Sequence, residues 1–389
     1  ELERVFPEKK AAQYFSMIRN GRANGKKYMK IGHAVDRNLY NEIIQFPLFR
    51  EGRYKSGMIV EQENIRQYPY GKLARRTIGF VRNNKSDVAN THIGLEGRFD
   101  YVLHGTEGRE WLRQTDEGRV RDNDSTSTAA VDGQDLRTTL NIDYQDIADK
   151  ALRTEIAGEE DLEGATLVLM EVSTGAIRAM VNLVRDRDNG TFEEIQNLAV
   201  GRKGEPGSVF KTVTLMSVLN DGFIRSLDET IPTNHGVIKG TGVKQDVHIL
   251  DYERNNRTSE ISIIDGFKMS SNYVFGSLAV NNYKSKKGAM RFIDNIHTYN
   301  LADSFDFDLD GLLTPTVPTP ETREAWSSTD LATMGYGYST EETPLHILTF
   351  YNAIANKGRM MLYWIYKINC KKRADLWPEE SVQWGREAF

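Results

Sequence analysis

The sequence predicts an α+β domain, with helices packed on an antiparallel sheet, preceded by an N-terminal module of short strands. Residues 166–172 and 176–183 have the composition of two strands, and the tight turn 173–175 joins them. Segments with helical spacing follow this pair instead of alternating with further strands, an order that favours an antiparallel sheet. The first 120 residues contain only short apolar segments interrupted by Gly and Asn, with scattered basic residues.

The N-terminal module is expected to end in a polar linker. Residues 68–71 and 94–97 predict turns between short strands, and the stretch 121–128 predicts a linker or surface loop. We therefore expect one domain at residues 1–135 and a second at residues 136–389.

The second domain contains further elements with clear signals. A short strand at 136–140 and a helix at 144–156 precede the strand pair. Three later helical regions are predicted, at about 208–220 before Asp221-Gly222, at 261–280 with a break near 269–272, and from Thr343-Pro344 to Lys357-Gly358.

Composition excludes several classes of protein. The 389 residues carry 50 basic and 55 acidic side chains, and 39% are hydrophobic, which indicates a globular chain of two or three domains and not a disordered one. No run of like charge marks a nucleic-acid-binding tail, so no nucleic-acid partner is expected. The single Cys370 excludes an intramolecular disulfide, and without H-E-x-x-H among seven His no metal or cofactor is predicted.

The candidate nucleophile is Ser208, in the segment Gly204-Glu-Pro-Gly-Ser-Val-Phe-Lys211. Pro206 and Gly207 place Ser208 at the mouth of the next helix, where unpaired backbone N–H groups favour negative charge on its oxygen. Lys211 lies one turn further on. The helix is apolar nearly all round, so burial would favour a neutral amine that can act as a general base. Taken alone, the pair favours an N-cap serine and a lysine that extends to solvent over a catalytic pair.

A second candidate is the sequence Ser270-Ser271-Asn272, which interrupts a helical region. A short loop there would present a hydroxyl for proton transfer and a carboxamide to hold a substrate amide. An ordinary polar turn explains this segment alone, but its order after S-x-x-K strengthens the catalytic interpretation.

Together these motifs resemble the class B penicillin-binding proteins, the monofunctional peptidoglycan D,D-transpeptidases. The segment from Glu205 to Lys211 resembles the family's nucleophile segment almost residue for residue. Further similarity is carried by the following segments: 171–180, 334–337, 343–345, 355–358, Arg66 to Gly71, and 94–96 with Tyr101 and Leu103. The Ser-Ser-Asn form of the second motif favours the division-specific, FtsI-type branch.

The resemblance implies a penicillin-binding/serine β-lactamase-like transpeptidase domain behind an elongated, strand-rich pedestal domain. It also implies that Ser208 attacks the penultimate D-Ala carbonyl of a stem peptide and that Lys211 takes the Ser208 proton. Ser270 would pass a proton to the leaving D-Ala, Asn272 would hold the substrate amide and Lys211, and β-lactams would acylate Ser208.

One family motif is missing. A K-T-G strand is expected downstream of the second motif, but Lys55-Ser56-Gly57 and Lys239-Gly-Thr-Gly242 both precede it and are rejected. Similarity also weakens after Met361, where Trp364, Trp377 and Trp384 follow. We expect the transpeptidase domain to be incomplete at its C-terminal end. Either part of the chain is left out of the sequence, which we favour, or the protein lacks the motif.

The resemblance implies peptidoglycan stem peptides as substrates, β-lactam antibiotics as inhibitors, and a membrane glycosyltransferase and division proteins as partners. It also implies an N-terminal membrane anchor, absent from this chain, and a catalytic domain in the periplasm. A β-lactam-binding sensor or scaffold that acylates without crosslinking is the alternative. A β-lactamase is disfavoured because those enzymes lack the pedestal.

Overall fold

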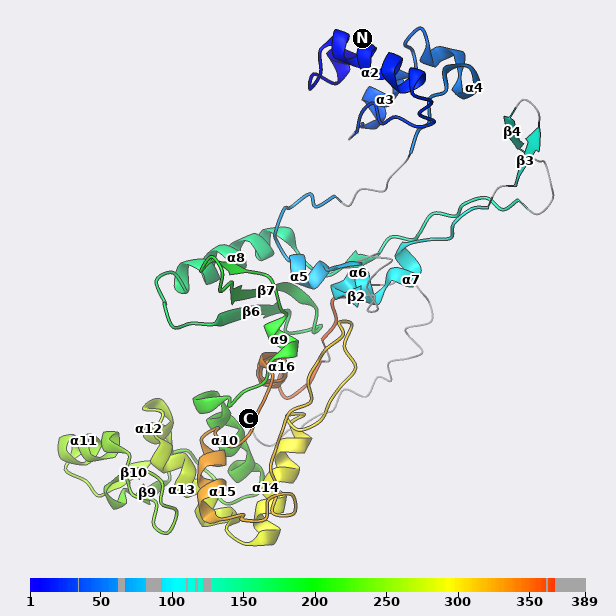
Figure 1. Ribbon diagram of the computed structural model, residues 1–389. Coiled ribbons are helices and arrows are strands. Elements are labelled where there is room, and N and C mark those ends of the chain that lie inside the picture. Colours follow the sequence, from blue (N-terminus) through cyan, green and yellow to red (C-terminus); the bar gives the residue numbers. More distant parts are fainter. Residues whose placement is uncertain are drawn as a thin grey trace. The chain divides into compact units, whose positions relative to one another are not determined.

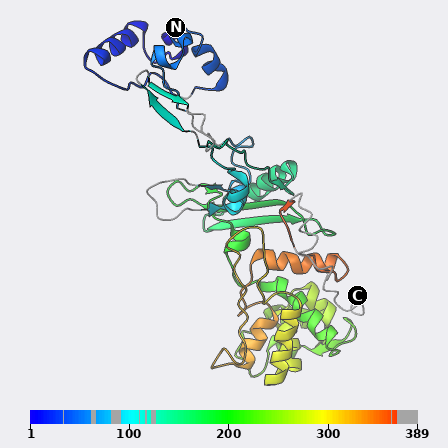
Figure 2. The same ribbon diagram turned by 90° about the vertical axis from the view of Figure 1, so that its right-hand side faces the viewer.

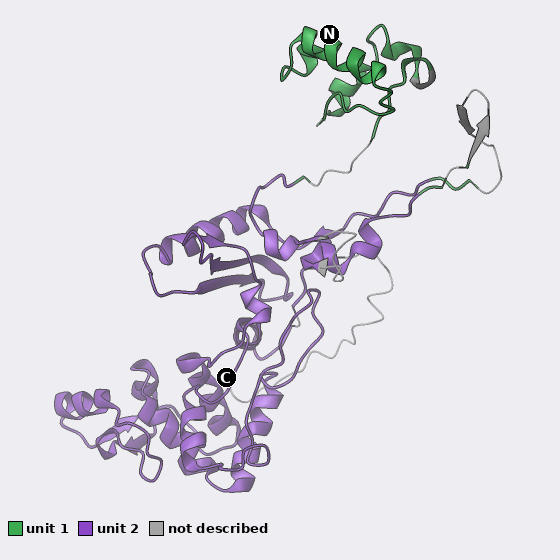
Figure 3. Cartoon of the chain, viewed as in Figure 1, with its two compact units in different colours: residues 1–67, 108–129 green, residues 68–107, 130–389 purple. Residues whose placement is uncertain are grey.

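The computed structural model describes residues 1–33, 35–61, 67–81, 92–109, 111–115, 118–121, 127–361 and 363–367 (Figure 1). The chain forms two compact units, which Figure 3 colours separately. One unit comprises residues 1–67 and 108–129, and the other comprises residues 68–107 and 130–389. Residues 68–107 therefore group with the second unit, although the sequence analysis placed them in the first domain.

The first unit is helical where strands were expected. Its elements are α1 (Leu2–Val5), α2 (Ala11–Ala23), α3 (Arg37–Ile43), the 3₁₀ turn η1 (Phe49–Glu51), α4 (Arg53–Ser56) and the hairpin β3 (Leu112–Thr115) to β4 (Gly118–Arg121). The prediction of a strand-rich module is thus wrong for residues 1–56. Helix α2 buries Tyr14 and Gly21, but Phe15 and Ile18 are exposed, so its apolar pattern lacks the single stripe that marks a helix.

Residues 68–107 begin with the expected turn at 68–71 and then differ from the prediction. They contain α5 (Arg75–Ile78), the strand pair β1 (Phe80–Val81) and β2 (His92–Ile93), α6 (Gly94–Arg98) and α7 (Asp100–Leu103). Residues 94–97 form the first turn of a helix and not a turn between strands. Arg66 and most of the predicted linker, residues 122–126, lie outside the described residues.

The sheet of the second unit is built on the predicted strand pair. Strand β6 (Gly164–Met170) is antiparallel to β7 (Ile177–Arg185), and β8 (Phe192–Glu193) adds to the end of β7. Among the described residues, no strand pairs with the other edge of β6. The expected strand at 136–140 is present as β5 (Arg137–Thr138), which pairs with β11 (Tyr366–Lys367).

Both faces of this sheet are covered by helices, as Figures 1 and 2 show. Alternate residues Ala179, Val181 and Leu183 of β7 pack in one cluster with Ala148 of α8 (Ile142–Glu155). On the opposite face, Met180 lies in a cluster that includes residues of α9 (Leu198–Gly201) and α16 (Pro344–Ala355). This is the layered α+β arrangement expected from the sequence.

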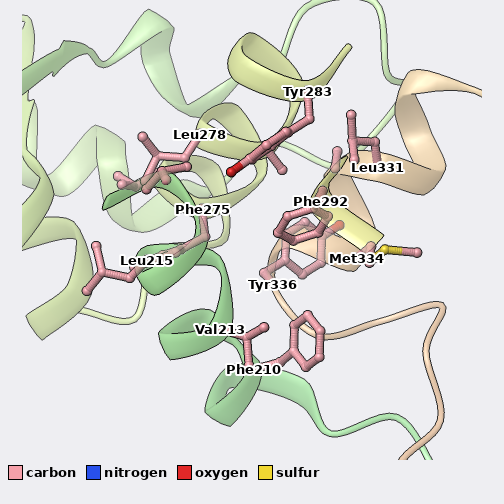
Figure 4. Packing of buried hydrophobic residues seen from close by; sticks show 14 of the residues in the cluster. Phe210, Val213, Leu215, Phe275, Leu278, Tyr283, Phe292, Leu331, Met334 and Tyr336 are labelled. Carbon is pink, nitrogen blue, oxygen red and sulfur yellow. The ribbon is translucent and has the colours of Figure 1, made fainter. Parts of the chain in front are cut away.

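A helical region with a large apolar core follows the sheet. It contains η2 (Gly207–Phe210), α10 (Lys211–Asn220), β9 (Thr230–Pro232), η3 (Asn234–Gly236), α11 (Val247–Asn256), β10 (Glu260–Ser262), α12 (Ile263–Lys268), α13 (Asn272–Tyr283), α14 (Lys286–Thr298) and α15 (Ser328–Gly335). Phe210 of the nucleophile segment, Val213 of α10, Phe275 of α13 and Phe292 of α14 are fully buried in this core (Figure 4). The three predicted late helical regions are confirmed, including the break near residue 270.

In the parts of the chain that the structure describes, no helix combines the length and apolar character needed to span a membrane.

Candidate active site

Ser208 lies in η2, one turn before α10, as the sequence predicts. Gly207 precedes it with φ +63°, a conformation that glycine adopts without strain, and so turns the chain into the helix. Phe210 anchors this turn in the core while Ser208 itself stays exposed. The turn thus fixes the backbone from inside and leaves the hydroxyl open to a substrate.

Lys211 is buried behind Ser208. Its residue exposure is 1%, and its Nζ lies 3.0 Å from Ser208 Oγ. A lysine that extends to solvent is therefore ruled out. Burial lowers the pKa of Lys211 to about 8, against the opposing field of the Asp246 carboxylate. About one tenth of the amine is then neutral at pH 7, far more than for an ordinary lysine, and the neutral form is the one that a general base for Ser208 requires.

Ser270 completes a three-residue cluster. Lys211 Nζ donates to Ser270 Oγ at 2.9 Å and also to the Ser270 carbonyl oxygen. Ser270 follows the end of α12 with φ +55°, a left-handed conformation that is uncommon for a residue other than glycine. The break between α12 and α13 thus brings the second motif to the amine, as the sequence interpretation requires.

Asn272 is placed differently from what the resemblance implies. It is the first residue of α13 and is exposed. Its carboxamide has no hydrogen-bond partner among the described residues, so the expected contact with Lys211 is not present. The structure therefore joins Ser208, Lys211 and Ser270 directly and leaves Asn272 free.

Sequence reasoning missed Asp246. This residue is the N-cap of α11, and its carboxylate accepts hydrogen bonds from Ser271 Oγ at 2.7 Å and from Tyr273 N at 3.1 Å. An aspartate before a helix is visible in the sequence as a cap signal. Its hydrogen bond to Ser271 of the second motif, 25 residues further on, is not indicated by any local sequence pattern.

The nucleophile turn is also held by hydrogen bonds to residues 337–342. Gly207 N donates to Gly337 O at 2.8 Å, and Glu205 Oε1 accepts from Ser339 N at 2.9 Å. Gly337 has φ +90°, and a Cβ there would lie 1.9 Å from Gly207 O. Only glycine allows this approach.

Neither of the rejected K-T-G look-alikes belongs to this cluster. Lys55 lies in α4 of the first unit and pairs with Glu51. Thr241 follows η3 and donates to the carbonyl of Ile238. The described residues thus supply no third motif, and residues 368–389, with Trp377 and Trp384, lie outside them.

Two protein-family models match the chain. The penicillin-binding protein transpeptidase domain matches residues 165–383, more than half of the chain, and the penicillin-binding protein dimerisation domain matches residues 2–138. The chain belongs to the penicillin-binding proteins. The resemblance drawn from its motifs is confirmed.

Curated relatives of this penicillin-binding protein include peptidoglycan D,D-transpeptidase FtsI of Escherichia coli K12, which is 28% identical over 308 residues. That match covers 78% of this chain and 48% of the relative. Penicillin-binding protein PbpB of Mycolicibacterium smegmatis is 24% identical over 307 residues, covering 77% of this chain and 44% of the relative. The penicillin-binding protein described here thus spans about half the length of the curated relatives it matches.

Solved structures show the same fold. Penicillin-binding protein 3 from Mycobacterium tuberculosis, complexed with ampicillin, is 26% identical with a TM-score of 0.59. The match covers 78% of this penicillin-binding protein and 61% of that chain. Penicillin-binding protein 2X from Streptococcus thermophilus has the same TM-score at 21% identity, covering 77% and 43% respectively. The predicted fold class, a transpeptidase domain behind a separate N-terminal domain, is confirmed.

Proposed function

We propose that this chain is the catalytic part of a peptidoglycan D,D-transpeptidase that works through a serine acyl-enzyme and is acylated by β-lactams. The observation that carries this proposal is the buried Lys211 amine, which lies within hydrogen-bond distance of both the Ser208 and Ser270 hydroxyls. A nucleophile, a base and a second hydroxyl in one cluster are the groups that acyl transfer without histidine needs.

In the first half-reaction, Ser208 Oγ bonds to the penultimate D-Ala carbonyl carbon of a stem peptide while Lys211 takes its proton. The Ser208 backbone N–H, in the first turn of the helix, stabilises the oxyanion. The carbonyl C–N bond then breaks. Ser270 gives its proton to the leaving D-Ala nitrogen and regains one from the Lys211 ammonium.

In the second half-reaction, an amine from a neighbouring stem attacks the Ser208 ester. Its proton passes to the neutral Lys211 and on to Ser208 Oγ as the ester bond breaks, which forms the crosslink and restores the enzyme. The exposed carboxamide of Asn272, which can both donate and accept, holds the substrate amide. With a β-lactam, the ring C–N bond opens but the nitrogen stays tethered, so the Ser208 ester persists.

The cellular setting is part of the same proposal. Relatives that carry the FtsI name support a role in septal cell-wall synthesis, with a membrane glycosyltransferase and division proteins as partners. The family resemblance supports an N-terminal membrane anchor and a catalytic domain in the periplasm. The family matches at 2–138 and 165–383 support a domain boundary near residue 135.

Covalent labelling with a fluorescent penicillin tests the chemistry. The wild-type chain should form a stable adduct on Ser208, located by mass spectrometry. Ser208→Ala should form none, while the control Ser226→Ala, in an exposed turn, should label like wild type. Labelling of Ser208→Ala at the wild-type level would show that the nucleophile lies elsewhere.

A second assay separates the enzyme from a sensor. Purified stem peptides and an acceptor amine should yield crosslinked product with the wild-type chain. Penicillin labelling without any crosslinked product would favour the β-lactam-binding sensor, an alternative supported by the lack of a K-T-G strand among the described residues.

A further inference from the structure

We propose that Asp246 is a positioning residue for the second motif, which holds the turn bearing Ser270 against Lys211 and sets the charge environment of that amine. This inference rests on the proposed acyl transfer. Asp246 touches neither Ser208 nor Ser270 through any hydrogen bond in the described residues, so it acts through the groups around them.

The geometry at Asp246 joins two helix starts. Its Oδ1 accepts from His248 N at 3.2 Å, which caps α11, and its Oδ2 accepts from Tyr273 N at 3.1 Å, in the first turn of α13. First-turn N–H groups lack intrahelical partners, and both helix dipoles present their positive end there. One carboxylate is therefore stabilised by two helices and fixes the start of α13 relative to α11.

The hydrogen bond between Asp246 and Ser271 also fixes the turn that bears Ser270. Ser271 is 1% exposed, donates its hydroxyl to Asp246 Oδ2 at 2.7 Å, and caps α13 by accepting from Val274 N at 3.2 Å. Ser270 immediately precedes Ser271 and has a left-handed backbone conformation. Such a conformation is strained and persists only where the surrounding structure holds it. A loosened Ser271 would let Ser270 relax away from Lys211.

Asp246 also acts on Lys211 through its charge. The turn at Ser270 offers the amine a hydroxyl and a carbonyl, and the nucleophile turn offers the Ser208 hydroxyl, all of them neutral. Among the described residues, the Asp246 carboxylate is the charged group that acts on Lys211. Its negative charge raises the Lys211 pKa, while burial lowers it. Asp246 thus keeps the amine partly protonated and able to return a proton through Ser270.

The test measures the rate of acylation by a fluorescent penicillin from about pH 6 to about pH 10, a range that brackets the titration of a buried lysine. In Asp246→Asn, the maximal rate should fall about tenfold, the value of about one hydrogen bond, and the midpoint of the pH profile should move to lower pH. Asp246→Glu, which retains the charge, should keep the wild-type midpoint.

Two further variants separate charge from structure. Ser271→Ala removes the hydrogen bond but leaves the carboxylate, so it should slow acylation without moving the midpoint. Asp251→Asn, a matched change on the exposed face of α11 where Asp251 pairs with Arg254, should alter neither quantity.

An Asp246→Asn profile with the wild-type midpoint would overturn the inference, as would an equal shift of the midpoint in Ser271→Ala. Failure of the wild-type chain to label would instead overturn the proposed function itself. Melting temperatures identify any variant that does not fold. If Asp246→Asn is such a variant, the rate of Ser271→Ala still tests the positioning role, and a wild-type rate in Ser271→Ala would contradict it.

Discussion

Lys211 Nζ lies 3.0 Å from Ser208 Oγ although the lysine is only 1% exposed, so the charged form of the base is destabilised where it meets the nucleophile. An exposed lysine at the same distance would remain protonated and could not accept the serine proton. The burial of Lys211 at the start of the apolar helix α10 is thus the structural cause of the proposed reactivity.

Replacement of Lys211 should separate catalysis from stability. Lys211→Met should slow acylation by a fluorescent penicillin by about 10²–10⁴-fold, the usual contribution of a general base. Its melting temperature should be no lower than that of wild type, because methionine fills the site without a charge to desolvate. Lys268→Met, at an exposed lysine, should label normally. A large loss of stability in Lys211→Met would show that the amine contributes to the fold.

Acylation should depend on pH through Lys211. The rate should rise from neutral pH and level off above an apparent pKa of about 8, because the neutral amine is the active form. Folding should respond with the same sign. The Lys211 pKa is about 8 in the folded state, below the ordinary lysine value of 10.5, so the unfolded chain binds more protons between these values and stability rises with pH there. A rate that does not change across the apparent pKa would contradict this assignment.

Gly337→Ala should disturb the nucleophile turn directly. The new Cβ would lie 1.9 Å from Gly207 O, so we expect a loss of about 1–3 kcal/mol in the free energy of unfolding and slower acylation. Gly190→Ala is the matched control, since Gly190 also has a positive φ but no atom within 4 Å of its Cβ position. Both variants carry the left-handed strain of about 1 kcal/mol, so only a larger effect at 337 supports the contact.

Glu342 is an acidic group whose burial should be measurable. Its residue exposure is 3%, both carboxyl oxygens lack partners among the described residues, and burial raises its pKa to about 9. The folded state therefore binds more protons than the unfolded state between 4.5 and about 9, and stability falls as pH rises through this window.

Glu342→Gln should remove this penalty. Its melting temperature should exceed that of wild type at about pH 8 and match it more closely at about pH 5, because glutamine does not ionise. Glu341→Gln, at a half-exposed neighbour that pairs with Lys203, should not reproduce the difference. Equal melting curves for Glu342→Gln and wild type at about pH 8 would show that the carboxyl has the same pKa in both states.

The parts of the structure encoded by local sequence were predictable. Helix α10 after Gly207, the break at Ser270 and the strand pair 164–185 each depend on a cap, a turn residue or an apolar period that the chain displays. These predictions needed no knowledge of distant contacts. The cluster of Ser208, Lys211 and Ser270 joins residues 59 positions apart in the sequence, and the family resemblance implied it where neither motif alone did.

The failures involve contacts that no local pattern encodes. Because Phe15 and Ile18 are exposed, the apolar residues of α2 form no single stripe, and this helical unit was predicted as strands. Asp246 reaches the second motif across 25 residues, and only the folded chain brings its carboxylate to Ser271. The expected contact of Asn272 with Lys211 came from family resemblance, and in this chain α13 begins with that side chain exposed.

The hydrogen bond between Gly207 and Gly337 joins the nucleophile turn to the chain after α15 through main-chain atoms alone. Substitutions that exchange side chains along either segment therefore leave the donor and the acceptor of this bond in place. Gly337 is different, because any carbon added to it enters the contact with Gly207.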